Sequence, residues 1–174
     1  MLNQPPHRVS AGRTYSSELS ATGRIVIPEK GNVVSPAMAS THRTVLLVDD
    51  SVDTLEMYAV GLAHAGYRPL TASDTAGALG QLRNEHPDAI VTDLQFDRGQ
   101  SGWELIDEIR NDPETRQVPV VVLTGRMDTS IVGNAERVGC VAVLRKPCLP
   151  QELALVLERV LPDSELPLTP DWNR

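Results

Sequence analysis

The residues of this chain whose types and spacing could do chemistry each stand at the end of a short apolar run. They are three carboxylates, a hydroxyl and an amine: Asp49, Asp50, Asp93, Thr124 and Lys146. Carboxylates crowded together repel one another and raise each other's pKa unless a cation lies between them. A hard divalent ion with oxygen ligands meets that need, and Mg²⁺ suits a site that it shares with water and phosphate. The amine would face the acidic cluster as a fixed positive charge, and the hydroxyl could donate a hydrogen bond to an arriving oxygen.

These side chains can meet only if the apolar runs before them are parallel strands of one sheet. Strands are expected at residues 45–48, 67–71, 88–92, 118–123 and 141–144. Helices are expected at residues 53–65, 103–111, 128–138 and 150–160, and another should follow the cap at 73–74 and run to residue 85. Such alternation predicts an α/β protein with helices on both faces of a parallel sheet. We favour a doubly wound, flavodoxin-like, five-stranded sheet in the order 2-1-3-4-5, with the site at the carboxyl ends of strands 1 and 3.

Composition divides the chain of 174 residues into three parts. Residues 1–43 are rich in small and polar residues with little periodicity, so we expect a mostly disordered, flexible N-terminal extension. Within it, the apolar segments 24–28 and 33–34 could pair as a weak hairpin. Residues 44–161 are expected to form the folded domain and residues 162–174 a short C-terminal tail.

Charge and cysteine content exclude several functions. The net charge is −7, and because residues 1–43 carry five basic and two acidic residues, the rest of the chain is more acidic still. An acidic domain has no electrostatic footprint for nucleic acid. No apolar run reaches the roughly 18 residues of a membrane span. Two cysteines, Cys140 and Cys148, make no disulfide framework, so we expect a cytoplasmic protein.

The sequence resembles the receiver domains of bacterial two-component response regulators over about residues 44–161. Four motifs carry the resemblance: Val45–Ser51, Asp88–Asp93, Val120–Gly125 and Leu144–Pro147. The resemblance implies that Asp93 is the phosphoacceptor and also a ligand of Mg²⁺. Asp50 would bind the ion directly, Asp49 through a water molecule and Gln95 through its backbone carbonyl. Thr124 would be the switch hydroxyl, and Lys146 the amine that pairs with the phosphoryl group. It also implies a cis bond between Lys146 and Pro147.

The same resemblance implies a mechanism and partners. Asp93 would attack in line the phosphohistidine of a sensor histidine kinase or a histidine phosphotransfer protein. The protein would be no enzyme in the usual sense, but a switch that catalyses only its own phosphorylation and dephosphorylation. No DNA-binding, nuclease or cyclase domain fits after residue 161, so output would pass through an unknown partner protein or onward transfer of the phosphoryl group. The apolar helix 150–160 suggests a homodimer through the last two helices, with core packing as the alternative.

The chain departs from the family pattern at three places. The loop after Asp93 lacks the usual proline and holds one extra residue before Gly102. Gly125 stands where alanine is commoner, and Val143 stands where many members have an aromatic residue that moves with the switch hydroxyl. We therefore expect the signal to pass through movement of residues 126–138.

Two other readings compete with a phosphorylated receiver. A pseudo-receiver would bind partners without phosphorylation, and the complete set of site residues argues against it. A flavodoxin-like enzyme would bind a nucleotide or flavin, and it should carry a glycine- and hydroxyl-rich phosphate loop after its first strand. Here residues 49–53 are largely acidic and would repel phosphate unless a metal ion is present.

Overall fold

The computed structural model describes residues 25–26, 43–96 and 101–161. The strands are β1 (Ile25–Val26), β2 (Thr44–Val48), β3 (Arg68–Ala72), β4 (Ala89–Thr92), β5 (Val120–Thr124) and β6 (Ala142–Arg145). The helices are α1 (Val52–His64), α2 (Thr75–Glu85), α3 (Gly102–Asn111), α4 (Thr129–Arg137) and α5 (Pro150–Val160). The predicted elements are all present, with ends that differ from the prediction by at most two residues.

The sheet has the order β1-β6-β5-β4-β2-β3. The strands β2 to β6 are parallel to their neighbours, and they confirm the predicted flavodoxin-like order 2-1-3-4-5. The order puts β2 beside β4 and β5 beside β6. All four strands therefore deliver their carboxyl ends to one edge of the sheet, where ligands bind in folds of this class.

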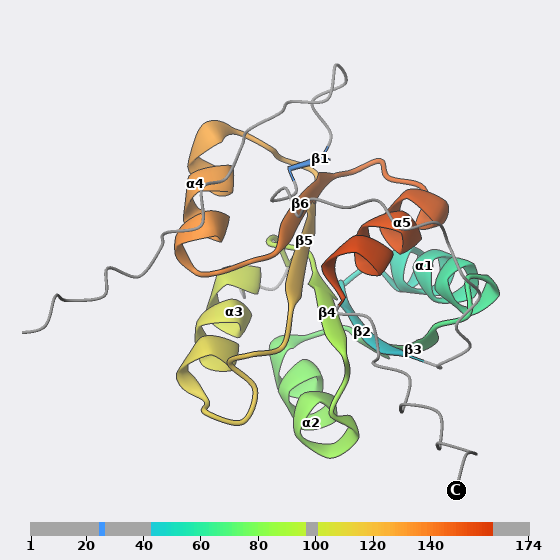
Figure 1. Ribbon diagram of the computed structural model, residues 1–174, viewed down its shortest axis with the longest axis horizontal. Coiled ribbons are helices and arrows are strands. Elements are labelled where there is room, and N and C mark those ends of the chain that lie inside the picture. The colour runs from blue at the N-terminus through green and yellow to red at the C-terminus, as the bar shows by residue number, and fades with distance from the viewer. Residues whose placement is uncertain (1–24, 27–42, 97–100, 162–174) are drawn as a thin grey trace, which may run out of the picture.

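Helices cover both faces of the sheet, α1 and α5 on one and α2, α3 and α4 on the other (Figure 1). Alternate residues of each strand serve the two faces: Leu47 packs with the first pair of helices and Leu46 with the other three. All five residues of β2 and of β5 are buried, as expected for central parallel strands.

The short strand β1 corrects part of the sequence reading. Residues 24–28 were expected at most to pair with residues 33–34 in a hairpin; instead Ile25 and Val26 pair antiparallel with Leu144 and Val143 of β6. The parallel sheet thus gains a sixth strand, contributed by the segment expected to be disordered. Residues 1–24 and 27–42 of the N-terminal extension, which include residues 33–34, lie outside the described residues.

The helix termini follow local sequence signals. Ser51, Asp74, Ser101 and Asp128 are N-caps whose side chains accept backbone N–H bonds from the first turn. Gly66 and Gly139 have positive φ after α1 and α4, a conformation in which glycine costs least. Across the part of the chain that the structure describes, no helix combines the length and apolarity that a membrane crossing requires.

Candidate functional site

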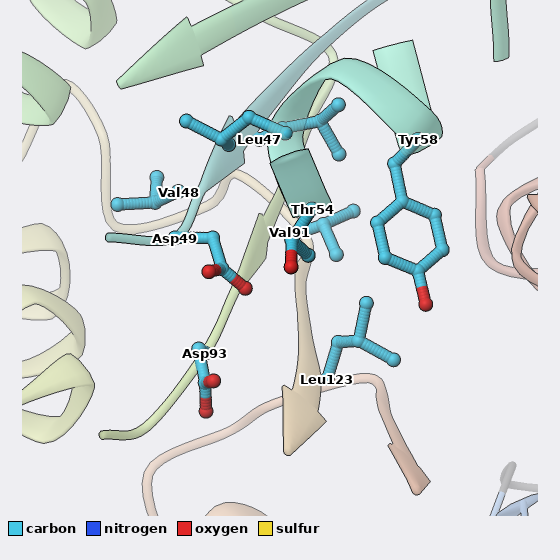
Figure 2. A pocket seen from close by; sticks show the side chains of 9 residues that line it. Leu47, Val48, Asp49, Thr54, Tyr58, Val91, Asp93 and Leu123 are labelled. Atoms are coloured by element: carbon cyan, nitrogen blue, oxygen red, sulfur yellow. The ribbon is translucent and has the colours of Figure 1, made fainter. Parts of the chain in front are cut away.

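The neighbouring strands β2 and β4 bring Asp49 and Asp93 together. Val48 pairs in register with Thr92, so the next residue of each strand lies at the same edge. The backbone N–H of Asp93 donates to the carbonyl of Val48 at 3.0 Å, which holds the two strand ends side by side. Both side chains are largely shielded, with 8% and 12% of their surface exposed. Asp49 and Asp93 both line a small cavity, and Figure 2 shows their carboxylates on the same side of the strands that carry them.

Lys146 reaches this pair of carboxylates from the end of β6. Its backbone N–H donates to the carbonyl of Thr124 at 2.8 Å, and the bond to Pro147 is cis, as expected. The ammonium donates to Asp49 Oδ2 at 2.5 Å and to Asp93 Oδ2 at 2.6 Å. Burial opposes the charged form, but the two carboxylates outweigh it and raise the pKa of Lys146 above its ordinary value. The amine is therefore a fixed positive charge between the two strand-end acids.

Backbone donors fix the other oxygens of both acids. Oδ1 of Asp93 accepts from the N–H groups of Leu94 at 2.5 Å and Gln95 at 3.2 Å. Oδ1 of Asp49 accepts from the N–H of Ser51 at 2.9 Å. Hydrogen bonds of this kind restrict the rotation of the carboxylate group. Asp93 is thus oriented, with its other oxygen facing the amine of Lys146.

The remaining predicted site residues lie around this centre. Thr124 ends β5, is fully buried, and accepts from the N–H of Arg126 at 3.4 Å through its hydroxyl oxygen. Asp50 is partly exposed at the start of the loop into α1. Gln95 is exposed and pairs with Ser101 in an isolated antiparallel bridge that closes the loop after Asp93. Residues 97–100 of that loop, the stretch expected to hold one extra residue, lie outside the described residues.

The site offers oxygen ligands of the kind that a hard divalent ion prefers. A cationic group, the ammonium of Lys146, is already bound between Asp49 and Asp93. Among the described residues, however, no three carboxylate, imidazole or thiol side chains converge closely enough to hold a metal ion. The expected acidic trio is thus, in this arrangement, a pair bridged by an amine, with Asp50 beside it.

Two further residues, which the sequence analysis did not assign to the site, lie next to it. A Cβ placed on Gly102 would collide with the backbone carbonyl of Asp93, so α3 can begin this close to the site only with glycine. Tyr58 lines the same cavity of about 10 Å³ as the two acids (Figure 2), and its hydroxyl donates to the carbonyl of Cys148 at 2.7 Å. The glycine could have been found from its place at the end of the loop; the partner of Tyr58 could not.

The aspartate pair and the lysine thus lie at the carboxyl edge of a doubly wound parallel sheet, the edge at which α/β domains of this class bind their ligands. Residues 45–158 match the response regulator receiver domain family, and the chain belongs to this family. The resemblance seen in the sequence is thereby confirmed.

Individual relatives agree with this family. The chain is 37% identical over 133 residues to the phosphate regulon transcriptional regulatory protein PhoB of Pseudomonas aeruginosa, covering 72% of this chain and 57% of that protein. It is 29% identical over 108 residues to the polar-differentiation response regulator DivK of Brucella ovis, covering 60% of this chain and 85% of that protein. The solved structure of the chemotaxis protein CheY4 of Vibrio cholerae is 30% identical, with a TM-score of 0.66, and covers 70% of this chain and 100% of that one. The chain spans a little over half the length of the PhoB relatives that it matches.

Proposed function

We propose that Asp93 accepts a phosphoryl group from a phosphohistidine and that the modified domain acts as a switch. The observation that carries this proposal is the contact of 2.6 Å between the Lys146 ammonium and Asp93 Oδ2, while Asp93 Oδ1 is bound by two backbone N–H groups. An oriented carboxylate beside a fixed positive charge is what in-line phosphoryl transfer requires, because the protein contributes chiefly positioning and charge neutralisation.

The transfer step forms one bond to phosphorus and breaks another. A carboxylate oxygen of Asp93 forms a bond to phosphorus as the bond from phosphorus to the donor's imidazole nitrogen breaks, and the nitrogen keeps that electron pair. Lys146 then pairs with the phosphoryl oxygens, to which Thr124 donates a hydrogen bond from its hydroxyl. Hydrolysis of the acyl phosphate returns Asp93 to its starting state. In this proposal the protein catalyses only its own phosphorylation and dephosphorylation.

The proposal includes a Mg²⁺ ion, which when bound would supply positive charge to offset that of the phosphoryl group. Asp49, Asp50, Asp93 and the backbone carbonyl of Gln95 would hold it. The oxygen-rich donor set and the cationic group already bound by Asp49 and Asp93 support this assignment. Because Lys146 shares both carboxylates, it would compete with the ion for Asp49.

The partners in this proposal are a sensor histidine kinase or histidine phosphotransfer protein and an unidentified output protein. Exposed apolar side chains beside the site suit a docking donor: Val52, three residues after Asp49, is 69% exposed, and Leu149, three after Lys146, is 64% exposed. The acidic character of the chain disfavours nucleic acid as a direct ligand. A cytoplasmic location and the boundaries 44–161 for the receiver stay predictions.

We further propose that the signal leaves through residues 126–138. Val143 is buried where an aromatic switch residue is usual, so no ring is present there to change rotamer. In α4, Ala135 is buried, but Ile131 and the C-cap residue Val138 are only partly buried, so few apolar contacts oppose movement of the helix. A homodimer through α4 and α5 stays a prediction: Leu155 is 58% exposed, whereas Leu157 belongs to the core.

The test is incubation with Mg²⁺ and a small phosphodonor, followed by intact mass and amide hydrogen exchange. Wild type should gain one phosphoryl group, which Asp93→Asn should not accept. Asp53→Asn, an exposed first-turn acid of α1, is the matched control and should be modified like wild type. An unmodified wild type would favour the pseudo-receiver. Unchanged exchange at residues 126–138 in the phosphorylated protein would exclude the proposed output route.

A further inference from the structure

We infer that Tyr58 is a positioning residue for Lys146, acting through the chain segment that follows the lysine. The inference rests on the proposed role of Lys146 in phosphoryl transfer, and it adds a residue of α1 to the machinery of that site. The inference concerns a contact between Tyr58 and Cys148, which are far apart in the chain. Neither residue belongs to the four sequence motifs that carry the family resemblance.

The first observation is the hydrogen bond between the Tyr58 hydroxyl and the backbone carbonyl of Cys148. The donor and acceptor atoms are 2.7 Å apart, the residues are 90 positions apart in the chain, and the Tyr58 side chain is 3% exposed. Cys148 is two residues beyond Lys146. The bond ties the segment that follows Lys146 to α1 in the interior of the protein.

The second observation is independent of the first and lies one helical turn along α1. A Cβ on Gly61 would collide with the side chain of Pro150, so the helix and the start of α5 are in direct contact there. On the other side of the segment, the N–H of Lys146 donates to the carbonyl of Thr124 at 2.8 Å. The segment 146–150 is therefore attached to β5 at one end and to α1 at the other.

The attachment matters because of where the lysine must reach. Its ammonium contacts two carboxylates at once, at 2.5 and 2.6 Å, from a side chain with four rotatable carbon–carbon bonds. A shift of the Lys146 backbone would move the ammonium relative to both carboxylates. A misplacement of about 1 Å can lower a reaction rate by up to about 100-fold. Fixing Cys148 limits that displacement.

Tyr58 does not take part in the chemistry directly. In Figure 2 its ring lies beyond Thr54 and beside Leu123, with the hydroxyl directed away from Asp49 and Asp93. Burial is the main cause that raises the pKa of Tyr58, to about 12, so the hydroxyl remains a neutral donor across the physiological range. Its influence on the site must therefore pass through the Cys148 carbonyl.

The experiment uses the fact that the chain contains two lysines, Lys30 and Lys146. Lysine labelled with ¹³C at the ε position gives two methylene signals, and Lys146→Met assigns them. In the metal-free full-length protein, Tyr58→Phe should move the Lys146 signal toward that of an unpaired lysine and leave Lys30 unchanged. Tyr67→Phe, a partly buried tyrosine packed against the same core, is the matched control and should move neither signal.

A kinetic double-mutant cycle gives the second readout. Tyr58→Phe should slow phosphorylation of Asp93 by a small phosphodonor roughly tenfold, and it should slow the Lys146→Met variant no further. The inference is overturned if the Lys146 signal stays in place in Tyr58→Phe, or if the tenfold loss recurs without the lysine. A wild type that takes no phosphoryl group would defeat the proposed function, while the NMR comparison would still decide the role of Tyr58.

Discussion

The ammonium of Lys146 lies between Asp49 and Asp93, 2.5 and 2.6 Å from one oxygen of each. One positive charge therefore serves two negative ones, and the three strands that carry these residues are joined at their carboxyl ends. Because the lysine side chain is 23% exposed and the acids are more deeply buried, removing the amine would leave two shielded carboxylates without their counter-charge, which costs more than breaking a surface ion pair. Loss of the amine should therefore destabilise the fold.

Lys146→Met should lower the free energy of unfolding by roughly 1–3 kcal/mol in metal-free buffer, as measured by urea denaturation. The substitution keeps the apolar stem and leaves two carboxylates facing each other without a cation. Arg68→Met, which removes an exposed ion pair with Glu85, is the control and should cost less than about 0.5 kcal/mol.

Added Mg²⁺ should recover more stability in Lys146→Met than in wild type, because the lysine no longer competes for Asp49. Thermal unfolding at increasing Mg²⁺ concentration measures the difference. If both proteins respond equally, the ion binds away from these two carboxylates.

Gly102→Ala should destabilise the domain by about 2 kcal/mol or more and slow the modification of Asp93. The added methyl group would meet the carbonyl of Asp93, so either α3 or the end of β4 must move. Gly80→Ala and Gly133→Ala are matched controls inside α2 and α4, where nothing lies within 4 Å of the new atom. These controls should stabilise the protein by roughly 0.5–1 kcal/mol, because alanine favours a helix more than glycine does. Denaturation curves for the three variants decide whether the clash dominates.

The sequence predicted the parallel sheet and the positions of Asp49, Asp93 and Lys146 because periodicity reports on strands and because parallel strand ends share one edge. It could not predict the contact between Tyr58 and Cys148, since hydrophobic patterning shows which face of a helix is inward but not which residue it touches. Pairing in register brings Asp49 beside Asp93. Asp50 lies in the loop into α1, whose direction the strand pattern does not fix, so its part in the site stays a prediction.

Alkaline pH should weaken the fold through Tyr58. Its pKa rises from about 10 to about 12 in the folded state, chiefly by burial, so the unfolded chain loses this proton first. The contribution is complete below about pH 10 and is lost as pH rises toward 12, at up to about 1.4 kcal/mol per pH unit. Urea denaturation between pH 9 and pH 11 should show a shallower decline in Tyr58→Phe than in wild type. Some decline should remain, because burial also raises the pKa of Tyr67.

Replacing Arg110 with lysine should lower the stability of the domain. Its guanidinium donates at 3.0–3.1 Å to four backbone carbonyls that end α4 or lead into β5, those of Arg116, Val118, Val138 and Gly139. A single ammonium cannot reach four acceptors that a planar fork spans, so Arg110→Lys should cost about 2 kcal/mol of stability. Arg137→Lys, an exposed arginine bonded to Asn134, should change stability by less than about 0.5 kcal/mol. Equal losses in the two variants would mean that the carbonyls find water instead.

The pairing of β1 with β6 predicts that the N-terminal segment protects an edge of the sheet. Ile25 pairs with Leu144, and Val26 pairs with Val143. Arg145 and Lys146 directly follow Leu144 in the chain. Substituting both with proline removes two backbone donors and disfavours the strand. Amide hydrogen exchange in β6 should then accelerate several-fold, up to roughly tenfold for a bond worth about 1 kcal/mol, while exchange in β4 stays unchanged.

The same variant should also associate more readily with itself. An edge strand without a cover presents unpaired N–H and C=O groups to other chains, so light scattering should show a mass that rises with protein concentration above that of wild type. Gly23→Pro, outside the paired residues, controls for the effect of proline in this segment. If β6 exchanges at the wild-type rate in the double variant, its edge is already open in solution, and residues 25–26 then contribute nothing to the sheet that positions Lys146.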